Sequence, residues 1–205
     1  GGASRVELCE RLEVGGVTPS AELIEKVMSV STLPVNVLVR PRGGDFFFNE
    51  EESLQMIEDI NLCKRLGVNG VVIGALDGDG NIDVDLMRSL MVEAKPLSVT
   101  FHRAFDCCAD PYKSIEDVIA LGCDRLLTSG LAASAYEGRG LISELVDMAG
   151  DRIIIMPGAG VRPSNIAALS QATRALEYHG SAHSEHGTTD RKVVSQLVDD
   201  SLQLL

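Results

Sequence analysis

Polar side chains follow short apolar runs at several points along the chain, and their types suit proton transfer and ligand binding. Histidine and glutamate are common proton-transfer groups, and the planar guanidinium of arginine holds carboxylate or phosphate groups. The candidate catalytic residues are His102, Glu177 and His179. The candidate ligand contacts are Glu7, Arg40, Arg42, Asp45 and Arg103. The alternative interpretation is that these side chains only cap helices or form ion pairs.

Two glycine-rich segments lie late in the chain, Met156-Pro-Gly-Ala-Gly160 and His179-Gly-Ser-Ala182. Glycine lets the backbone approach a bound anion, and the amides at a helix start favour negative charge. The sequence therefore predicts anion contacts from Gly158, Gly160, Gly180 and Ser181. Tight-turn geometry alone is the other interpretation of the same glycines.

Five cysteines, an odd number without regular spacing, are typical of reduced cytoplasmic thiols and not of a disulfide framework. Cys9 stands at the end of an apolar run, and thiolate is a preferred ligand of Cu(I). Cys9 is therefore the candidate metal ligand. Cys63 and Cys123 fall at positions that predict buried packing residues.

Short β-branched runs recur along the chain and predict strands. The expected strands are Val6 to Cys9, Val35 to Arg40, Gly70 to Gly74, Ser98 to His102, Arg125 to Thr128, Ile153 to Pro157 and Ala175 to His179. Most of these runs are apolar without a break, which is typical of parallel strands covered by helices. Alternation along a strand places Thr100 and His102 on one face, and likewise Glu7 with Cys9 and Glu177 with His179.

The segments between the runs carry helix signals. Asn49 and Glu52 have the spacing of a capping box, while Asp83 and Asp110 are expected to cap two further helices. The expected buried stripes are Leu54, Ile57, Ile60 and Cys63 in the first helix, and Leu86, Leu90 and Ala94 in the second. The remaining helices are expected over 20–30, 140–149, 163–170 and 190–205.

The alternation of seven strands with seven helices predicts an α/β fold. A closed TIM-type (β/α)8 barrel needs eight such units in about 250 residues. This chain has 205 residues and opens with Gly1-Gly-Ala, a pattern that suits a turn before a strand. We therefore expect a single barrel domain over 1–205 that lacks the first N-terminal β-α unit. A doubly wound open sheet is the alternative, but no G-x-G-x-x-G follows the first predicted strand.

Charge and hydropathy exclude two classes of partner. The formal net charge of −12 argues against nucleic acid, whose phosphates are bound by basic residues that displace counterions. No stretch approaches about 18 consecutive apolar residues, so no membrane partner is expected. The first residues lack a basic segment followed by an apolar one, so we expect a cytoplasmic protein.

Six strings occur in order through nearly the whole chain. They are Arg5-Val-Glu-Leu-Cys9, Gly15-Gly-Val-Thr-Pro-Ser20, Val39-Arg-Pro-Arg-Gly-Gly-Asp-Phe46, Thr100-Phe-His-Arg-Ala-Phe-Asp106, Leu127-Thr-Ser-Gly130 and Met156-Pro-Gly-Ala-Gly160. Together they resemble the CutC copper-homeostasis family. The resemblance implies a cytoplasmic β/α barrel that forms homo-oligomers, dimers or tetramers, and that binds Cu(I) through cysteine in some members. Cys9 matches one of the implicated cysteines, and the family's second cysteine lies on a first strand that this chain lacks.

Two functions fit these residues. In the first, Cys9 and a second soft ligand, from the missing strand or a neighbouring subunit, bind Cu(I) for copper homeostasis. In the second, the chain is a TIM-barrel enzyme in which Arg40, Arg42 and the glycine-rich loops hold a small carboxylated or phosphorylated metabolite. Arginine and backbone amides suit such anions better than Cu(I), so the residues themselves favour the enzyme. A third possibility, a non-catalytic interaction protein, finds no large exposed apolar signature in its support.

Overall fold

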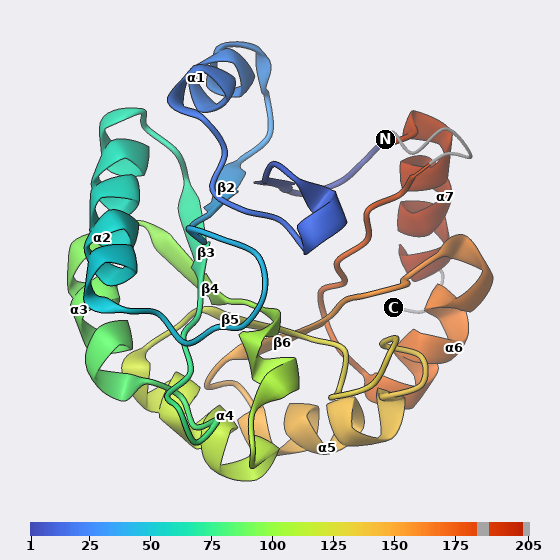
Figure 1. Cartoon of the computed structure of the whole chain (residues 1–205). Helices are drawn as coiled ribbons and strands as arrows, with labels where there is room; N and C mark the ends of the chain where they lie inside the picture. Colours follow the sequence, from blue (N-terminus) through green and yellow to red (C-terminus); the bar gives the residue numbers. More distant parts are fainter. Residues whose placement is uncertain (184–188, 203–205) are drawn as a thin grey trace. The chain divides into compact units, whose positions relative to one another are not determined.

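The computed structural model describes residues 1–183 and 189–202, and the chain divides into two compact units. The first unit is Ser4–Asp124, and the second is Arg125–Leu205 together with Gly1–Ala3. Figure 1 labels their strands and helices, coloured along the sequence. Both units alternate strands with helices, so the α/β class predicted from the sequence is confirmed.

The first unit consists of four strands with helices between them. The strands are β1 (Val6–Leu8), β2 (Val35–Leu38), β3 (Gly70–Ile73) and β4 (Ser98–Phe101). The α-helices are α1 (Ala21–Val30), α2 (Glu50–Arg65), α3 (Val84–Ala94) and α4 (Pro111–Leu121), and two short 3-10 helices are η1 (Leu12–Val14) and η2 (Arg103–Cys107). Each strand stops one or two residues before its predicted end, where the chain turns into a loop.

Neighbouring strands of this unit pair in parallel and in chain order. The register sets Leu38 opposite Val72 and Val72 opposite Thr100. Because paired residues in a parallel ladder point to the same side, and successive residues point to opposite sides, this register determines which side chains share a face. The same rule puts Glu7 on the face of Asn36, its partner on β2.

Side-chain caps explain where the helices of the first unit begin. Asn49 accepts a hydrogen bond from the Glu52 amide at 2.9 Å, and Glu52 accepts one from the Asn49 amide at 3.0 Å, which confirms the predicted capping box. Asp83 caps α3 by accepting from Leu86, and Asp110 caps α4. Each cap satisfies amides that have no partner inside the helix and contributes about 1 kcal/mol.

The buried stripes of α2 and α3 differ in part from the predicted ones. In α2, Met56 is fully buried while Leu54 is 56% exposed, and in α3 Met87 is buried in place of Leu86. Ile60 and Cys63 are buried as expected. Helices α2 and α3 pack against each other, as Figure 1 shows, and α3 also contacts α4. The packing of neighbouring helices determines which of two adjacent apolar stripes is buried, and the periodicity of the sequence alone does not determine this.

The second unit contains two parallel strands, β5 (Arg125–Thr128) and β6 (Ile154–Pro157). Its helices are α5 (Arg139–Ala149), α6 (Pro163–Thr173) and α7 (Arg191–Leu202), of which α6 contacts both others. The predicted helix 190–205 is therefore confirmed as far as residue 202, and its last three residues lie outside the described chain. No helix in the described part of the chain is long and apolar enough to cross a membrane.

The prediction of a strand from Ala175 to His179 is wrong, because this segment has no regular structure. His179 donates its amide to the Pro157 carbonyl at 2.9 Å, so the segment lies beside the end of β6. Side chains take over backbone bonds that a strand ladder would use. The Tyr178 hydroxyl donates to the Ala175 carbonyl, and the Ala175 amide donates to the Thr173 hydroxyl.

Candidate functional site

Three neighbouring strand ends in the first unit carry Arg40, Gly74 and His102 in one row. The Val39 amide donates to the Val72 carbonyl, and the His102 amide donates to the Ile73 carbonyl, so the ladders continue past the last strand residues. Arg40 and His102 therefore lie one strand to either side of Gly74. Adjacent strands are about 4.8 Å apart, so roughly 10 Å separates the two backbones.

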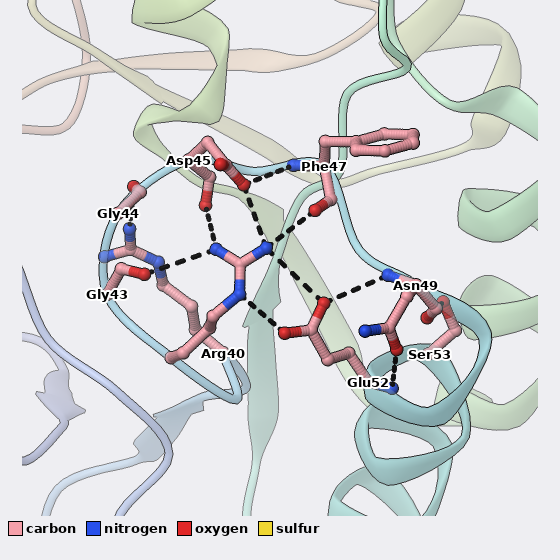
Figure 2. A network of polar contacts seen from close by, with 9 residues as sticks. Arg40, Gly43, Gly44, Asp45, Phe47, Asn49, Glu52 and Ser53 are labelled. Atoms are coloured by element: carbon pink, nitrogen blue, oxygen red, sulfur yellow. Dashed lines mark hydrogen bonds and ion pairs between the residues drawn. The ribbon is translucent and has the colours of Figure 1, made fainter.

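The Arg40 guanidinium is buried and held by main-chain carbonyls. Its Nη1 donates to Val14 and Gly16 at 3.3 and 3.2 Å, and its Nη2 donates to Gly44 at 2.6 Å, beside the loop drawn in Figure 2. Arg40 is only 4% exposed, and within the described chain it has no carboxylate partner. Its Nε is buried and has no hydrogen-bond partner in residues 1–183 and 189–202. Burial, followed by the charge of Arg42, lowers the pKa of Arg40, yet a guanidinium remains protonated in proteins.

The His102 imidazole is buried and neutral. Its Nδ1 accepts a hydrogen bond from the Ala104 amide at 3.2 Å, which leaves the ring proton on Nε2. Burial and the nearby charge of Arg40 lower the pKa of His102 from 6.5 to about 3. Nε2 is buried and has no partner in the described chain. His102 is thus poised as a hydrogen-bond donor, whereas a base at neutral pH would need a much higher pKa.

Phe46 connects these two side chains, and Gly74 makes room for one of them. The Phe46 ring centre lies 4.5 Å from the Arg40 guanidinium carbon and 5.1 Å from the His102 ring centre. A Cβ atom at position 74 would lie 2.5 Å from His102 Nδ1, so only glycine allows the imidazole this close to β3. Thr100, on the same face as His102, is 1% exposed, and its Oγ1 also lacks a partner in the part of the chain that the structure describes.

Arg42 holds the loop between β2 and α2 in place and is not free to bind an anion. Its Nε donates to Glu52 at 2.5 Å, and its Nη2 donates to the Phe47 carbonyl at 2.8 Å and pairs with Asp45 at 2.9 Å. Hydrogen bonds from Arg42 are the main reason that the pKa values of Asp45 and Glu52 are lowered. As Figure 2 shows, Glu52 also bonds Asn49, so this network ties the loop that carries Phe46 to the first turn of α2.

The other predicted contacts of the first unit are less closely grouped. Arg103 is paired with Asp106 within η2 at 2.7 Å. Cys9 is partly buried near Gly16, and burial, with a further contribution from the charge of Glu7, raises the pKa of its thiol. Within the described residues, no group of three or more histidine, cysteine, aspartate or glutamate side chains could hold a metal ion.

The second unit contains the remaining predicted residues. Glu177 forms a two-point ion pair with Arg125, with distances of 2.7 and 3.1 Å, so its carboxylate is already engaged. The two glycine-rich segments meet, since a Cβ at Gly158 would lie 3.4 Å from His179 Cβ. Gly160 has a positive φ of 73°, and its carbonyl accepts from Asn165 at 2.8 Å, while the Ser181 carbonyl accepts from Thr189. Anion binding by Gly158, Gly160, Gly180 and Ser181 therefore stays a prediction.

Phe46 and Gly74 were missed by the sequence analysis. Phe46 is the last residue of the R-P-R-G-G-D-F string. An aromatic residue so close to two arginines could have indicated a cation–π contact. Gly74 ends an apolar run, and a glycine at such a place often marks close approach of another group.

The cysteines differ enough in exposure to predict an order of reaction. Cys107 is exposed and Cys9 is partly buried. Cys63 and Cys123 are buried, and this burial is the main reason that the pKa of each thiol is raised to about 12. We expect a disulfide reagent such as DTNB to modify Cys107 of the folded protein first and Cys9 more slowly, because thiolate is the reactive form. Cys63 and Cys123 should react only after unfolding. Cys107→Ser should remove the fast phase of the DTNB reaction. Fast release of thionitrobenzoate from that variant would show that Cys107 is not the first cysteine to react.

Parallel strands alternating with helices, and polar side chains at the carboxyl ends of those strands, define an α/β protein of the TIM-barrel type. Comparisons with known proteins agree. The sequence model of the CutC family matches residues 1–184. The chain belongs to the CutC family.

Individual relatives support this assignment. A CutC family protein of Parabacteroides distasonis is 55% identical over 90% of this chain and 76% of its own length, and one of Xylella fastidiosa strain Temecula1 is 53% identical over 90% and 69%. The crystal structure of a candidate copper homeostasis protein, CutC of Streptococcus agalactiae, has a TM-score of 0.82 at 37% identity and covers 86% of this chain and 88% of its own. Phosphoribosylanthranilate isomerase of Thermotoga maritima, with a TM-score of 0.61 at 13% identity over 98% of this chain and 88% of its own, shares the fold. The predicted TIM-type fold class is thereby confirmed.

Proposed function

We propose that this chain is an enzyme that binds a small carboxylated or phosphorylated metabolite at Arg40 and His102. Three buried polar atoms that have no hydrogen-bond partner among the described residues support this proposal, namely Arg40 Nε, Thr100 Oγ1 and His102 Nε2. Each of them can donate a hydrogen bond, and a buried donor without an acceptor costs about 1–3 kcal/mol. A ligand rich in acceptor oxygens would satisfy all three.

The charge of Arg40 favours an anion among such ligands. Arg42 bonds two carboxylates, whereas Arg40 has only main-chain carbonyls as partners in the described chain. The charge of Asp45 acts on Arg40 without a hydrogen bond between them, and a bound carboxylate or phosphate would add a directly bonded counter-charge. The site therefore suits a metabolite whose anionic group approaches Arg40.

Cu(I) handling in the cytoplasm is a second candidate function. The copper-homeostasis name of the Streptococcus agalactiae relative and the partly buried thiol of Cys9 favour it. In this proposal Cu(I) is the cargo, held by the Cys9 thiolate and a second soft ligand from a neighbouring copy in a homo-oligomer. The raised pKa of Cys9 means that Cu(I) must displace the thiol proton on binding.

A thermal-shift experiment tests the first proposal with inorganic phosphate, pyruvate, malate and 3-phosphoglycerate as probes. A probe at ten times its Kd should stabilise the protein by about 1.4 kcal/mol, or about 3 to 6 °C. Arg40→Met should weaken binding about 100-fold, because a charge-assisted hydrogen bond is lost. Arg88→Met is the matched control, since Arg88 is exposed on α3 and pairs only weakly with Asp85.

Two further variants complete the test. Arg40→Lys keeps the charge while losing the planar fork, so it should fold even if Arg40→Met does not, and bind about tenfold more weakly. Cys9→Ser should leave the anion response intact and abolish stoichiometric Cu(I) uptake if copper is also bound. The anion site would be rejected if no probe stabilised the wild type. It would also be rejected if Arg40→Met and Arg40→Lys both bound the probes as tightly as the wild type does.

A further inference from the structure

We propose that the ligand is a small 2-oxo acid, whose carboxylate binds Arg40 and whose ketone oxygen accepts a hydrogen bond from His102 Nε2. This inference rests on the proposed function and specifies its substrate class. His102 would act by polarising the carbonyl group, as a fixed and uncharged donor.

The first step of the argument is the orientation of the imidazole. His102 caps η2 by accepting the Ala104 amide at Nδ1. A flip of the ring would replace this acceptor by a carbon atom and leave a buried amide unsatisfied, which is unfavourable. Phe46 and Phe101 flank the ring, and Gly74 lies against its Nδ1 side. The direction of the Nε2–H donor is therefore fixed before any ligand arrives.

The second step is the division of charge between the two donors. Arg40 carries a permanent positive charge that disfavours a second cation at His102, and both lie against the same Phe46 ring. A negative group is therefore best placed at Arg40, while the neutral His102 suits an uncharged oxygen. The two backbones are roughly 10 Å apart with Gly74 between them, so a ligand of only a few atoms is long enough to contact both side chains.

The third step is that all three unsatisfied groups can donate. The carboxylate and ketone of a 2-oxo acid offer three acceptor oxygens and bring no donor of their own. The corresponding 2-hydroxy acid brings a hydroxyl proton toward Arg40 and His102, which have no lone pair to receive it. Thr100 Oγ1 could accept that proton, but it would then no longer be satisfied as a donor, as it would be by an oxo acid.

Calorimetric titration with two matched pairs, pyruvate with lactate and 2-oxobutyrate with 2-hydroxybutyrate, tests this inference. The wild type should bind each oxo acid at least about tenfold more tightly than its hydroxy partner, since one unsatisfied polar contact is worth about 1.4 kcal/mol or more. In His102→Leu this ratio should fall to about one, and in His102→Gln, which keeps a donor, it should fall only in part. His183→Gln, at an exposed histidine of the second unit, is the matched control and should keep the full ratio.

Two spectroscopic readouts separate a carbonyl contact from a merely structural role. The infrared stretch of the ketone of [2-13C]pyruvate should shift to lower frequency on binding to the wild type and not to His102→Leu. Long-range 1H–15N spectra of the free protein should show His102 neutral and protonated at Nε2 at pH 6. An imidazolium or an Nδ1–H tautomer there would overturn the inference, with or without a ligand.

The outcomes also separate this inference from the proposed function. If anions bind through Arg40 but oxo and hydroxy acids bind equally, the metabolite site stands and the oxo-acid assignment is wrong. If no probe binds the wild type, both are rejected.

Discussion

Gly138→Ala should destabilise the protein by about 3 kcal/mol, lowering its Tm by about 6 to 12 °C. A Cβ atom at Gly138 would collide with the Ser129 carbonyl and approach Gly130 Cα at 2.9 Å. Both contacts are with main-chain atoms, which cannot turn away as a flexible side chain does. The end of β5 and the start of α5 would have to separate, at the cost of the contacts around buried Ala135. Urea denaturation followed by circular dichroism measures the loss.

Gly140→Ala is the matched control two residues away. Gly140 lies within α5, and a Cβ atom there would meet no atom within 4 Å. Alanine is the better helix former, so this variant should gain about 0.5 kcal/mol. If Gly138→Ala also proved neutral or stabilising, the close approach of the two main-chain segments would be wrong.

Local signals predicted most of the elements well. The capping box of Asn49 and Glu52 and the caps at Asp83 and Asp110 depend on residues within three positions of one another, so the sequence contains all the information they need. The apolar strands were recognisable for a similar reason. The strand prediction failed over 175–179, where Tyr178 bonds the Ala175 carbonyl and Thr173 bonds the Ala175 amide, because an apolar pattern does not show which backbone groups side chains will bond.

The candidate site was predictable in part. Arg40 and His102 were identified because they follow apolar runs, and strand alternation placed Thr100 with His102. The opposite roles of Arg40 and Arg42 were not foreseeable from two identical side chains two positions apart. Glu52, ten residues further along, binds Arg42 and leaves Arg40 facing carbonyls, and that choice depends on the three-dimensional course of the loop. For the same reason the pairing of Glu177 with Arg125 could not be predicted from the order of residues alone.

Buried His102 should make the protein sensitive to mild acid. Its pKa is about 3 in the folded protein, because of burial first and the charge of Arg40 second, whereas an exposed histidine has a pKa of 6.5. As the pH falls below 6.5 the unfolded chain binds this proton and the folded protein does not, so the contribution to stability is present above pH 6.5 and is progressively lost toward pH 3. Between pH 7 and pH 5 the loss should be about 2 kcal/mol in the free energy of unfolding.

The comparison with His102→Gln isolates this effect from that of the carboxylates. Glutamine has an amide that can donate but no group that titrates in this range, so the variant should lose about 2 kcal/mol less than the wild type between pH 7 and pH 5. No described carboxylate bonds the His102 ring, and the charged side chain that acts on it, Arg40, does not titrate here. Urea unfolding at each pH measures the difference, and parallel curves for wild type and His102→Gln would show that the imidazole takes up its proton in the folded state.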